Sequence, residues 1–244
     1  MICEFYFRSI MCNAHPKRIL VFGDSNTWGW CPRDDMERTV RFDKAVRWPG
    51  VLAARLGFDY EIIEEGLSAR TTNLDDPRED LPCEYLRGTT LNGAKILPAL
   101  LASHLPLDLV VIMLGTNDLK ARFKRTPKNI AQAVIGLVQL IKQCEGGMFT
   151  SYGSPKVLLI APPPLGAKFH NPEIWVGGGE KSLKLGTLLK YAARPENIPV
   201  FDASEVINTD GADGVHLTAE AHRKLGEAVA DQIHTLFGPP TAVA

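Results

Sequence analysis

A serine, an aspartate and a histidine stand at positions that could support nucleophilic catalysis. Ser25 directly follows an apolar run, 19–22, and the turn residues Gly23 and Asp24. Asp213 and His216 lie three residues apart in the stretch DGVH. In a turn, residues with this spacing lie on the same side, so Asp213 could accept the Nδ1 proton of His216 and leave Nε2 free for the serine hydroxyl. This pattern favours acyl transfer through a serine nucleophile.

Each of these residues also has a simpler interpretation. Ser25 could cap a helix, and Asp213 could be a turn former, since both residue types are common in turns. Asn117, in the stretch GTND, could form an Asx turn. A metal site built from Asp118, Asp213 and His216 lacks the ligand spacing of known metal motifs, so we expect no metal.

Alternating strands and helices would bring the polar residues to one place. Apolar runs predict strands over 18–23, 60–65, 108–114, 156–161 and 199–201. Helical spacing predicts helices over 48–56, 95–105, 129–144, 182–193 and 218–237. Five such alternations predict an α/β fold with a parallel sheet covered by helices on both faces. Ligands bind beyond the carboxyl ends of strands in such sheets, where 23–25, Gly66, 115–118 and 209–216 would all fall.

Length and composition restrict the class of protein. The chain has 244 residues and 45% hydrophobic content, which suits one large core. We expect a single domain over 17–238, an N-terminal extension over 1–16 and a C-terminal tail over 239–244. Lys and Arg number 27 against 28 Asp and Glu, so we expect neither nucleic acid nor an anionic membrane as a partner.

The cysteines and the apolar runs predict the cellular location of the protein. The five cysteines are an odd number without a C-x-x-C pair, which argues against a disulfide framework and favours the cytoplasm. No apolar stretch reaches the length of about 18 residues that a membrane span requires. Two long irregular stretches, 31–47 and 67–94, are typical of segments that carry function or an interface.

Four short blocks, taken together, resemble the SGNH or GDSL-type hydrolases. They are GDSNT (23–27), EEGLSART (64–71), GTND (115–118) and DGVH (213–216), in this order and each after a predicted strand. The chain is most similar to the arylesterase/acyltransferase (perhydrolase) branch over roughly 17–237. The resemblance implies a flavodoxin-like three-layer α/β/α sandwich with a five-stranded parallel sheet. It also implies a catalytic triad and an oxyanion hole, with Ser25, Asp213 and His216 as the triad and with Ser25, Gly66 and Asn117 as the oxyanion donors.

The same resemblance implies an activity. We expect a serine esterase that hydrolyses short-chain acyl esters, above all acetyl esters, of aryl, alkyl or carbohydrate alcohols through an acyl-enzyme. Transfer to an alcohol or peroxide acceptor and assembly into a homo-oligomer, expected to be an octamer, are also implied, and no cofactor is needed. The predicted substrate-binding residues are Trp30, Asn26, Ala69 and Lys120. Asn26 departs from the family, which usually has an apolar residue there.

Two other functions remain open at this point. A thioesterase or lysophospholipase would use the same triad. A non-catalytic nucleotide-binding α/β module is suggested by the glycines at 177–179. However, no predicted strand runs into a G-x-G-x-x-G motif, and we expect these three glycines to lie in a loop.

Overall fold

Five parallel strands form one sheet in the computed structural model, which describes residues 15–33, 39–78, 81, 83 and 85–238. The strands are β1 (Lys17–Gly23), β2 (Tyr60–Gly66), β3 (Leu109–Met113), β4 (Lys156–Ala161) and β5 (Val200–Asp202). Their order in the sheet is β2-β1-β3-β4-β5. The chain therefore winds to one side of β1 and then to the other, and the carboxyl ends of β1 and β3 form the point at which ligands bind in such sheets.

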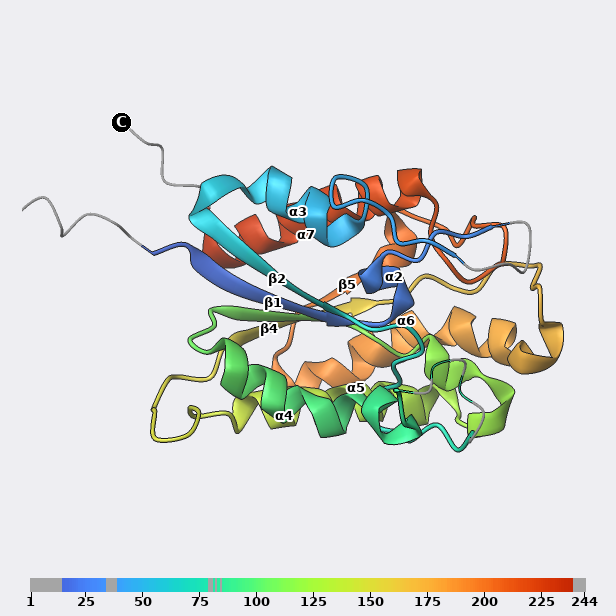
Figure 1. Cartoon of the computed structure of the whole chain (residues 1–244), viewed down its shortest axis with the longest axis horizontal. Helices are drawn as coiled ribbons and strands as arrows, with labels where there is room; N and C mark the ends of the chain where they lie inside the picture. The colour runs from blue at the N-terminus through green and yellow to red at the C-terminus, as the bar shows by residue number, and fades with distance from the viewer. Residues whose placement is uncertain (1–14, 34–38, 79–80, 82, 84, 239–244) are drawn as a thin grey trace, which may run out of the picture.

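Helices cover both faces of this sheet. They are α2 (Ser25–Trp28), α3 (Trp48–Leu56), α4 (Gly93–His104), α5 (Pro127–Lys142), α6 (Gly178–Ala193) and α7 (Ala219–Phe237). Figure 1 shows α3 and α7 on one face and α4, α5 and α6 on the other. The short helix α2 lies at the carboxyl end of β1. The predicted three-layer α/β/α sandwich with a five-stranded parallel sheet is confirmed.

Strand β1 is apolar from Ile19 to Phe22 because this part of it contributes to two cores. Ile19 and Val21 pack in the core beneath α3 and α7. Leu20 and Phe22 pack in the core formed with α4, α5 and α6. Successive side chains of a strand point to opposite faces, so a continuous apolar run is what a central parallel strand requires. This rigid strand fixes the position of whatever follows Gly23.

Three expectations about local structure need correction. Helix α6 begins at Gly178 rather than at 182, so Gly178 and Gly179 are helical and only Gly177, with φ of 69°, precedes the helix. The glycines at 177–179 are therefore not a loop. Helix α4 begins at Gly93, and the stretch 67–94 also contains a 3₁₀ helix, Gly88–Leu91. The earlier starts of α4 and α6 extend helical structure toward the carboxyl edge of the sheet.

Parts of the predicted organisation lie outside the described residues. These are residues 1–14 of the proposed extension, residues 34–38 of the first long stretch, residues 79–80, 82 and 84 of the second, and the tail 239–244. Within the described part of the chain, no helix combines the length and apolar character needed to cross a bilayer. Cys31, Cys83 and Cys144 carry free thiols.

Candidate active site

Ser25 is the first residue of α2 and lies at the carboxyl end of the central strand β1. It does not cap the helix, because that position belongs to Asp24, whose Oδ1 accepts the Asn26 N–H at 3.0 Å. The helix ends at Gly29, which has φ of 93° and so adopts the left-handed conformation that glycine tolerates. Ser25 is thereby held between a strand and a one-turn helix, and it is 5% exposed.

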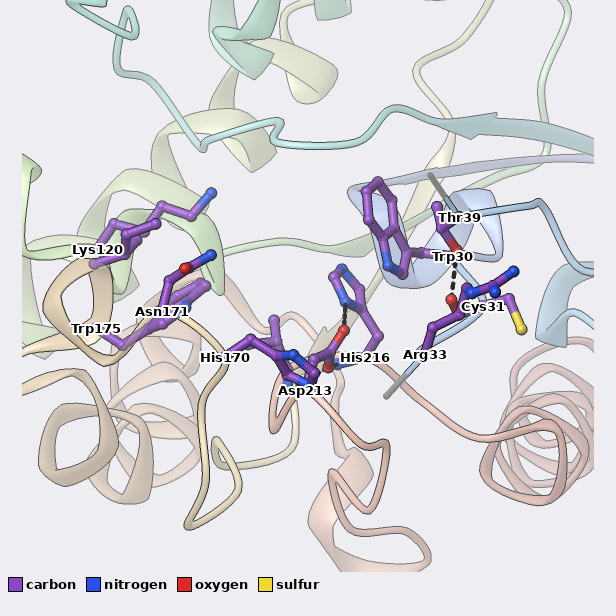
Figure 2. Close-up of a pocket in the computed structure, with 12 residues that line it drawn as sticks. Trp30, Cys31, Arg33, Thr39, Lys120, His170, Asn171, Trp175, Asp213 and His216 are labelled. Carbon is purple, nitrogen blue, oxygen red and sulfur yellow. Dashed lines mark hydrogen bonds and ion pairs between the residues drawn. The ribbon is translucent and has the colours of Figure 1, made fainter. Parts of the chain in front are cut away.

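His216 and Asp213 reach Ser25 from the loop between β5 and α7. The His216 Nε2 atom lies 2.8 Å from the Ser25 Oγ atom, although the two residues are 191 positions apart. The His216 Nδ1 atom lies 2.6 Å from Asp213 Oδ2, an interaction drawn in Figure 2. The three side chains form one continuous chain of hydrogen bonds, as the spacing of Asp213 and His216 predicted.

Asp213 also shapes the loop that carries His216. Its Oδ1 atom accepts the N–H groups of Val215 at 2.9 Å and of His216 at 2.8 Å. Burial favours the neutral acid, but the hydrogen bonds and charge of His216 outweigh burial and lower the pKa of Asp213 to about 2. The group is therefore a carboxylate at neutral pH and stabilises an imidazolium beside it.

Gly66 is the last residue of β2 and Asn117 follows β3, and these two strands flank β1 in the sheet. Asn117 begins a 3₁₀ helix, Asn117–Leu119, and its Nδ2 donates to the Arg70 carbonyl at 3.1 Å. A carboxamide nitrogen carries two hydrogens, so a second one remains for another acceptor. Gly66 ends β2 in register with Gly23 of β1. Both residues thus lie at the same edge of the sheet as Ser25.

Arg70 is a buried residue of the site that the sequence analysis did not single out. Its Nη1 donates to the carbonyls of Gly23, at 2.8 Å, and of Glu65. The Glu65 carbonyl and the Gly66 N–H belong to one planar peptide unit, so Arg70 fixes the direction in which that N–H points. Burial lowers the pKa of Arg70 to about 10. The residue lies in the block EEGLSART, but sequence alone cannot show that its guanidinium turns inward.

Two cavities meet at His216. The Ser25 cavity has a volume of about 360 Å³ and is lined mainly by apolar side chains together with Ser25, Ala69 and Asn117. The Asp213 cavity, shown in Figure 2, has a volume of about 220 Å³ and contains polar groups such as Thr39, His170 and Asn171. Residues that line both cavities are Trp30, Lys120, Trp175, Val215 and His216. His216 therefore faces both cavities, whereas Ser25 faces only the more apolar one.

Trp30 and Ala69, two of the predicted substrate-binding residues, line the cavities. The Trp30 ring stacks on the His216 ring, with centroids 4.9 Å apart and planes 18° apart. Ala69 lines the Ser25 cavity and has φ of 66°, an uncommon conformation for a residue with a side chain.

Lys120 stands where the two cavities meet. Its Nζ atom lies 5.3 Å from the centre of the Trp175 ring. Burial, followed by the charges of Arg122 and Arg78, lowers the pKa of Lys120 to about 7. Trp175, which belongs to a short 3₁₀ helix, gave no periodic signal in the sequence.

The prediction that Asn26 contacts substrate is not supported by its position. Asn26 is 2% exposed and is not among the residues that line either cavity. Its side chain donates to the Val215 carbonyl at 3.2 Å and accepts the Leu217 N–H at 3.1 Å. Both polar atoms are therefore bound to the backbone on either side of His216 and are not directed at the cavities.

No metal site accompanies these residues in the described part of the chain, where no three His, Cys, Asp or Glu side chains cluster in a way that could hold an ion. Asp118 is fully buried and accepts the Thr72 N–H at 3.0 Å. Burial raises the pKa of Asp118 to about 6. This aspartate connects β3 to the segment after β2.

Comparison with known proteins identifies the family. The family model described as GDSL-like lipase/acylhydrolase matches residues 21–224. The chain belongs to this family. A search of curated proteins gave no match.

Solved structures of similar proteins cover nearly the whole chain. A carbohydrate acetylesterase from Sinorhizobium meliloti is 49% identical, with a TM-score of 0.84 over 91% of this chain and 100% of that one. The aryl esterase of M. smegmatis is 50% identical, with a TM-score of 0.83 over 90% of this chain and 99% of that one. A second carbohydrate acetylesterase family member from Sinorhizobium meliloti is 35% identical, with a TM-score of 0.80 over 91% and 100%. The protein is a carboxylic ester hydrolase of the serine esterase type.

Proposed function

We propose that Ser25 is the nucleophile, His216 the general base and Asp213 the residue that orients the base. The observation that carries this proposal is the 2.8 Å distance between Ser25 Oγ and His216 Nε2, together with the 2.6 Å contact between His216 and Asp213. Because Asp213 accepts the Nδ1 proton, the neutral imidazole presents a lone pair on Nε2 to the serine.

The reaction follows from this arrangement in two halves. His216 takes the Ser25 proton while Oγ forms a bond to the ester carbonyl carbon. The tetrahedral intermediate then collapses, the bond to the alcohol oxygen breaks, and His216 gives its proton to that oxygen. In the second half, a water molecule attacks the acyl-enzyme and gives a proton to His216. The bond between the acyl carbon and Ser25 Oγ then breaks, His216 returns the proton to Oγ, and the carboxylic acid is released.

The developing negative charge needs donors that are already oriented. We assign this role to the N–H group of Ser25 and to the second Nδ2 hydrogen of Asn117, both residues that line the Ser25 cavity; the Gly66 N–H stays a prediction, because Gly66 does not line that cavity. The first hydrogen on Asn117 Nδ2 is held by Arg70, and the Gly66 peptide is held through its Glu65 carbonyl. Donors fixed before the reaction stabilise an oxyanion without reorganising, and each is worth about 3 kcal/mol in related sites.

The proposed substrates are short-chain acyl esters, above all acetyl esters, of aryl, alkyl or carbohydrate alcohols. Two features support them: the activities named for the carbohydrate acetylesterase and the aryl esterase that this chain resembles, and the small volumes of the two cavities. The aromatic wall formed by Trp30 against His216 also favours acyl transfer to an alcohol or peroxide, because it limits access of water to the imidazole.

The nucleophile is tested by covalent labelling. A fluorophosphonate probe is reacted with the wild-type chain and with Ser25→Ala, and the labelled peptide is mapped. We expect the label on Ser25 in the wild type and neither label nor esterase activity in the variant. Label on a different serine, or ester hydrolysis retained by Ser25→Ala, would contradict the proposal.

The acyl preference is tested by a chain-length series. Aryl acetate, butyrate, octanoate and palmitate are compared with an acyl thioester and a lysophospholipid. We expect kcat/KM to be highest for acetate and to fall with chain length. A preference for long-chain thioesters or for the phospholipid would instead favour the thioesterase or lysophospholipase activity.

Two further properties are proposed from resemblance and cysteine usage. We propose a homo-oligomer, which size-exclusion chromatography with light scattering would reveal as a mass well above 26.8 kDa. A monomer at micromolar concentration would contradict it. A cytoplasmic location stays a prediction from cysteine usage, to be checked by fractionation of cells.

A further inference from the structure

One buried amide side chain connects the helix of Ser25 to the loop of His216. Asn26 follows Ser25 in α2, and its Nδ2 donates to the Val215 carbonyl at 3.2 Å. Its Oδ1 accepts the Leu217 N–H at 3.1 Å. The residues it binds are those immediately before and after His216, so the peptide units on both sides of the histidine are held by one side chain.

Apart from the Ser25–His216 hydrogen bond and the stacking of the Trp30 ring on His216, the other hydrogen bonds of this loop are made within the loop or to the segment after β4. Asp213 binds the N–H groups of Val215 and His216 from within the loop itself. Gly214 accepts the Gly166 N–H at 2.8 Å, which joins the loop to the segment after β4. Asn26, in contrast, spans 189 and 191 positions of sequence to reach the loop from the nucleophile's own helix.

The peptide groups that Asn26 binds have little access to water. Leu217 is fully buried and Val215 is 7% exposed. A buried N–H or carbonyl without a partner is unfavourable, so loss of the amide would favour movement of the loop toward solvent. The imidazole moves with its backbone, and a displacement of about 1 Å between reacting groups can lower a rate about 100-fold.

We propose that Asn26 is a positioning residue, which holds His216 at hydrogen-bonding distance from Ser25. The proposal rests on the function assigned to Ser25 and His216 above. In this role Asn26 contributes to the reaction without touching the substrate. An apolar residue of similar size would fill the same space but could bind neither peptide group.

The test compares two variants on the same short helix. Asn26→Leu removes both hydrogen bonds and keeps the same number of side-chain heavy atoms. Thr27→Val is the matched control: Thr27 is fully buried beside Asn26, and its Oγ1 has no hydrogen-bond partner in the described structure. For each variant, active sites are titrated with a fluorophosphonate, and kcat and KM for an aryl acetate are measured per titrated site.

A positioning role predicts a particular combination of results. In Asn26→Leu, kcat per titrated site should fall about 10- to 100-fold while KM changes less than about threefold. Thr27→Val should keep kcat within about threefold of the wild type. If Asn26 only stabilises the fold, Asn26→Leu would have fewer titratable sites but a normal kcat at each, and the proposal would be overturned.

A third variant separates this proposal from the one on which it rests. Ser25→Ala should lose all activity if the assigned nucleophile is correct. Activity retained in Ser25→Ala would reject both proposals. Activity lost in Ser25→Ala, with a normal kcat per site in Asn26→Leu, would reject the positioning role alone.

Discussion

Gly66 allows helix α2, which carries Ser25, to lie directly against strand β2. A methyl group at this position would lie 2.3 Å from the Trp28 backbone nitrogen and 2.6 Å from both the Thr27 carbonyl carbon and the Trp28 Cα. These are backbone atoms of α2, so no side-chain rotation can relieve the overlap. Gly66 does not have a positive φ, and the effect of Gly66→Ala is therefore steric rather than conformational.

The size of the effect follows from these distances. Carbon and nitrogen atoms pack at about 3.5 Å or more, so α2 and β2 must separate by about 1 Å to admit the methyl group. Ser25 belongs to α2 and would be displaced relative to His216. We expect kcat/KM for an aryl acetate to fall about 100-fold and the free energy of unfolding to decrease by about 1–3 kcal/mol.

The assay pairs this variant with a glycine that has room for a side chain. Gly136 lies inside α5, and no atom lies within 4 Å of an added methyl group. Gly136→Ala should keep kcat/KM and stabilise the fold by about 0.5–1 kcal/mol, because alanine favours the helix. Both variants are measured by steady-state hydrolysis and by urea unfolding. A kcat/KM within about threefold of the wild type for Gly66→Ala would refute the reasoning.

Three other substitutions follow from the same geometry. Asp213→Asn should lower kcat about 1,000-fold or more, because the amide nitrogen would face His216 Nδ1 and favour the wrong tautomer; less than tenfold loss at pH 8 would count against the triad. His222 accepts the Trp48 N–H, and burial, followed by the charge of His216, lowers its pKa to about 3. The unfolded chain thus binds a proton that the native state excludes between about pH 6.5 and 3, so stability should decrease as pH falls through this window, by at most about 1.4 kcal/mol per pH unit. His222→Gln should show a shallower decrease in unfolding experiments from pH 7 to 4.5, and an identical slope would contradict this account. Trp30→Ala should raise the ratio of hydrolysis to alcoholysis in mixed water and alcohol, and an unchanged ratio would remove the tryptophan from the control of acceptor choice.

Hydrophobic patterning made the strands and long helices predictable. The run at 19–22 belongs to a strand that is buried on both faces, and a continuous apolar run is typical of interior strands in parallel sheets. Thr126, ahead of Pro127, marks the start of α5, where its side chain accepts the Asn129 N–H. The start of α6 was missed because Gly178 and Gly179 have low helix propensity, which the following turns overcome.

The sequence by itself determined the pairing of Asp213 with His216 and the place of Ser25 after a central strand. The first follows from the three-residue spacing of Asp213 and His216. The second follows from the apolar run that directly precedes Ser25. Only the tertiary structure decided what Asn26 and Arg70 bind. Their partners are backbone groups brought near by sheet order and loop path, and a polar residue in a sequence does not reveal which distant carbonyl or N–H it will satisfy. Asn26 was predicted to contact substrate, and the tertiary structure shows instead that it links the helix of Ser25 to the loop of His216.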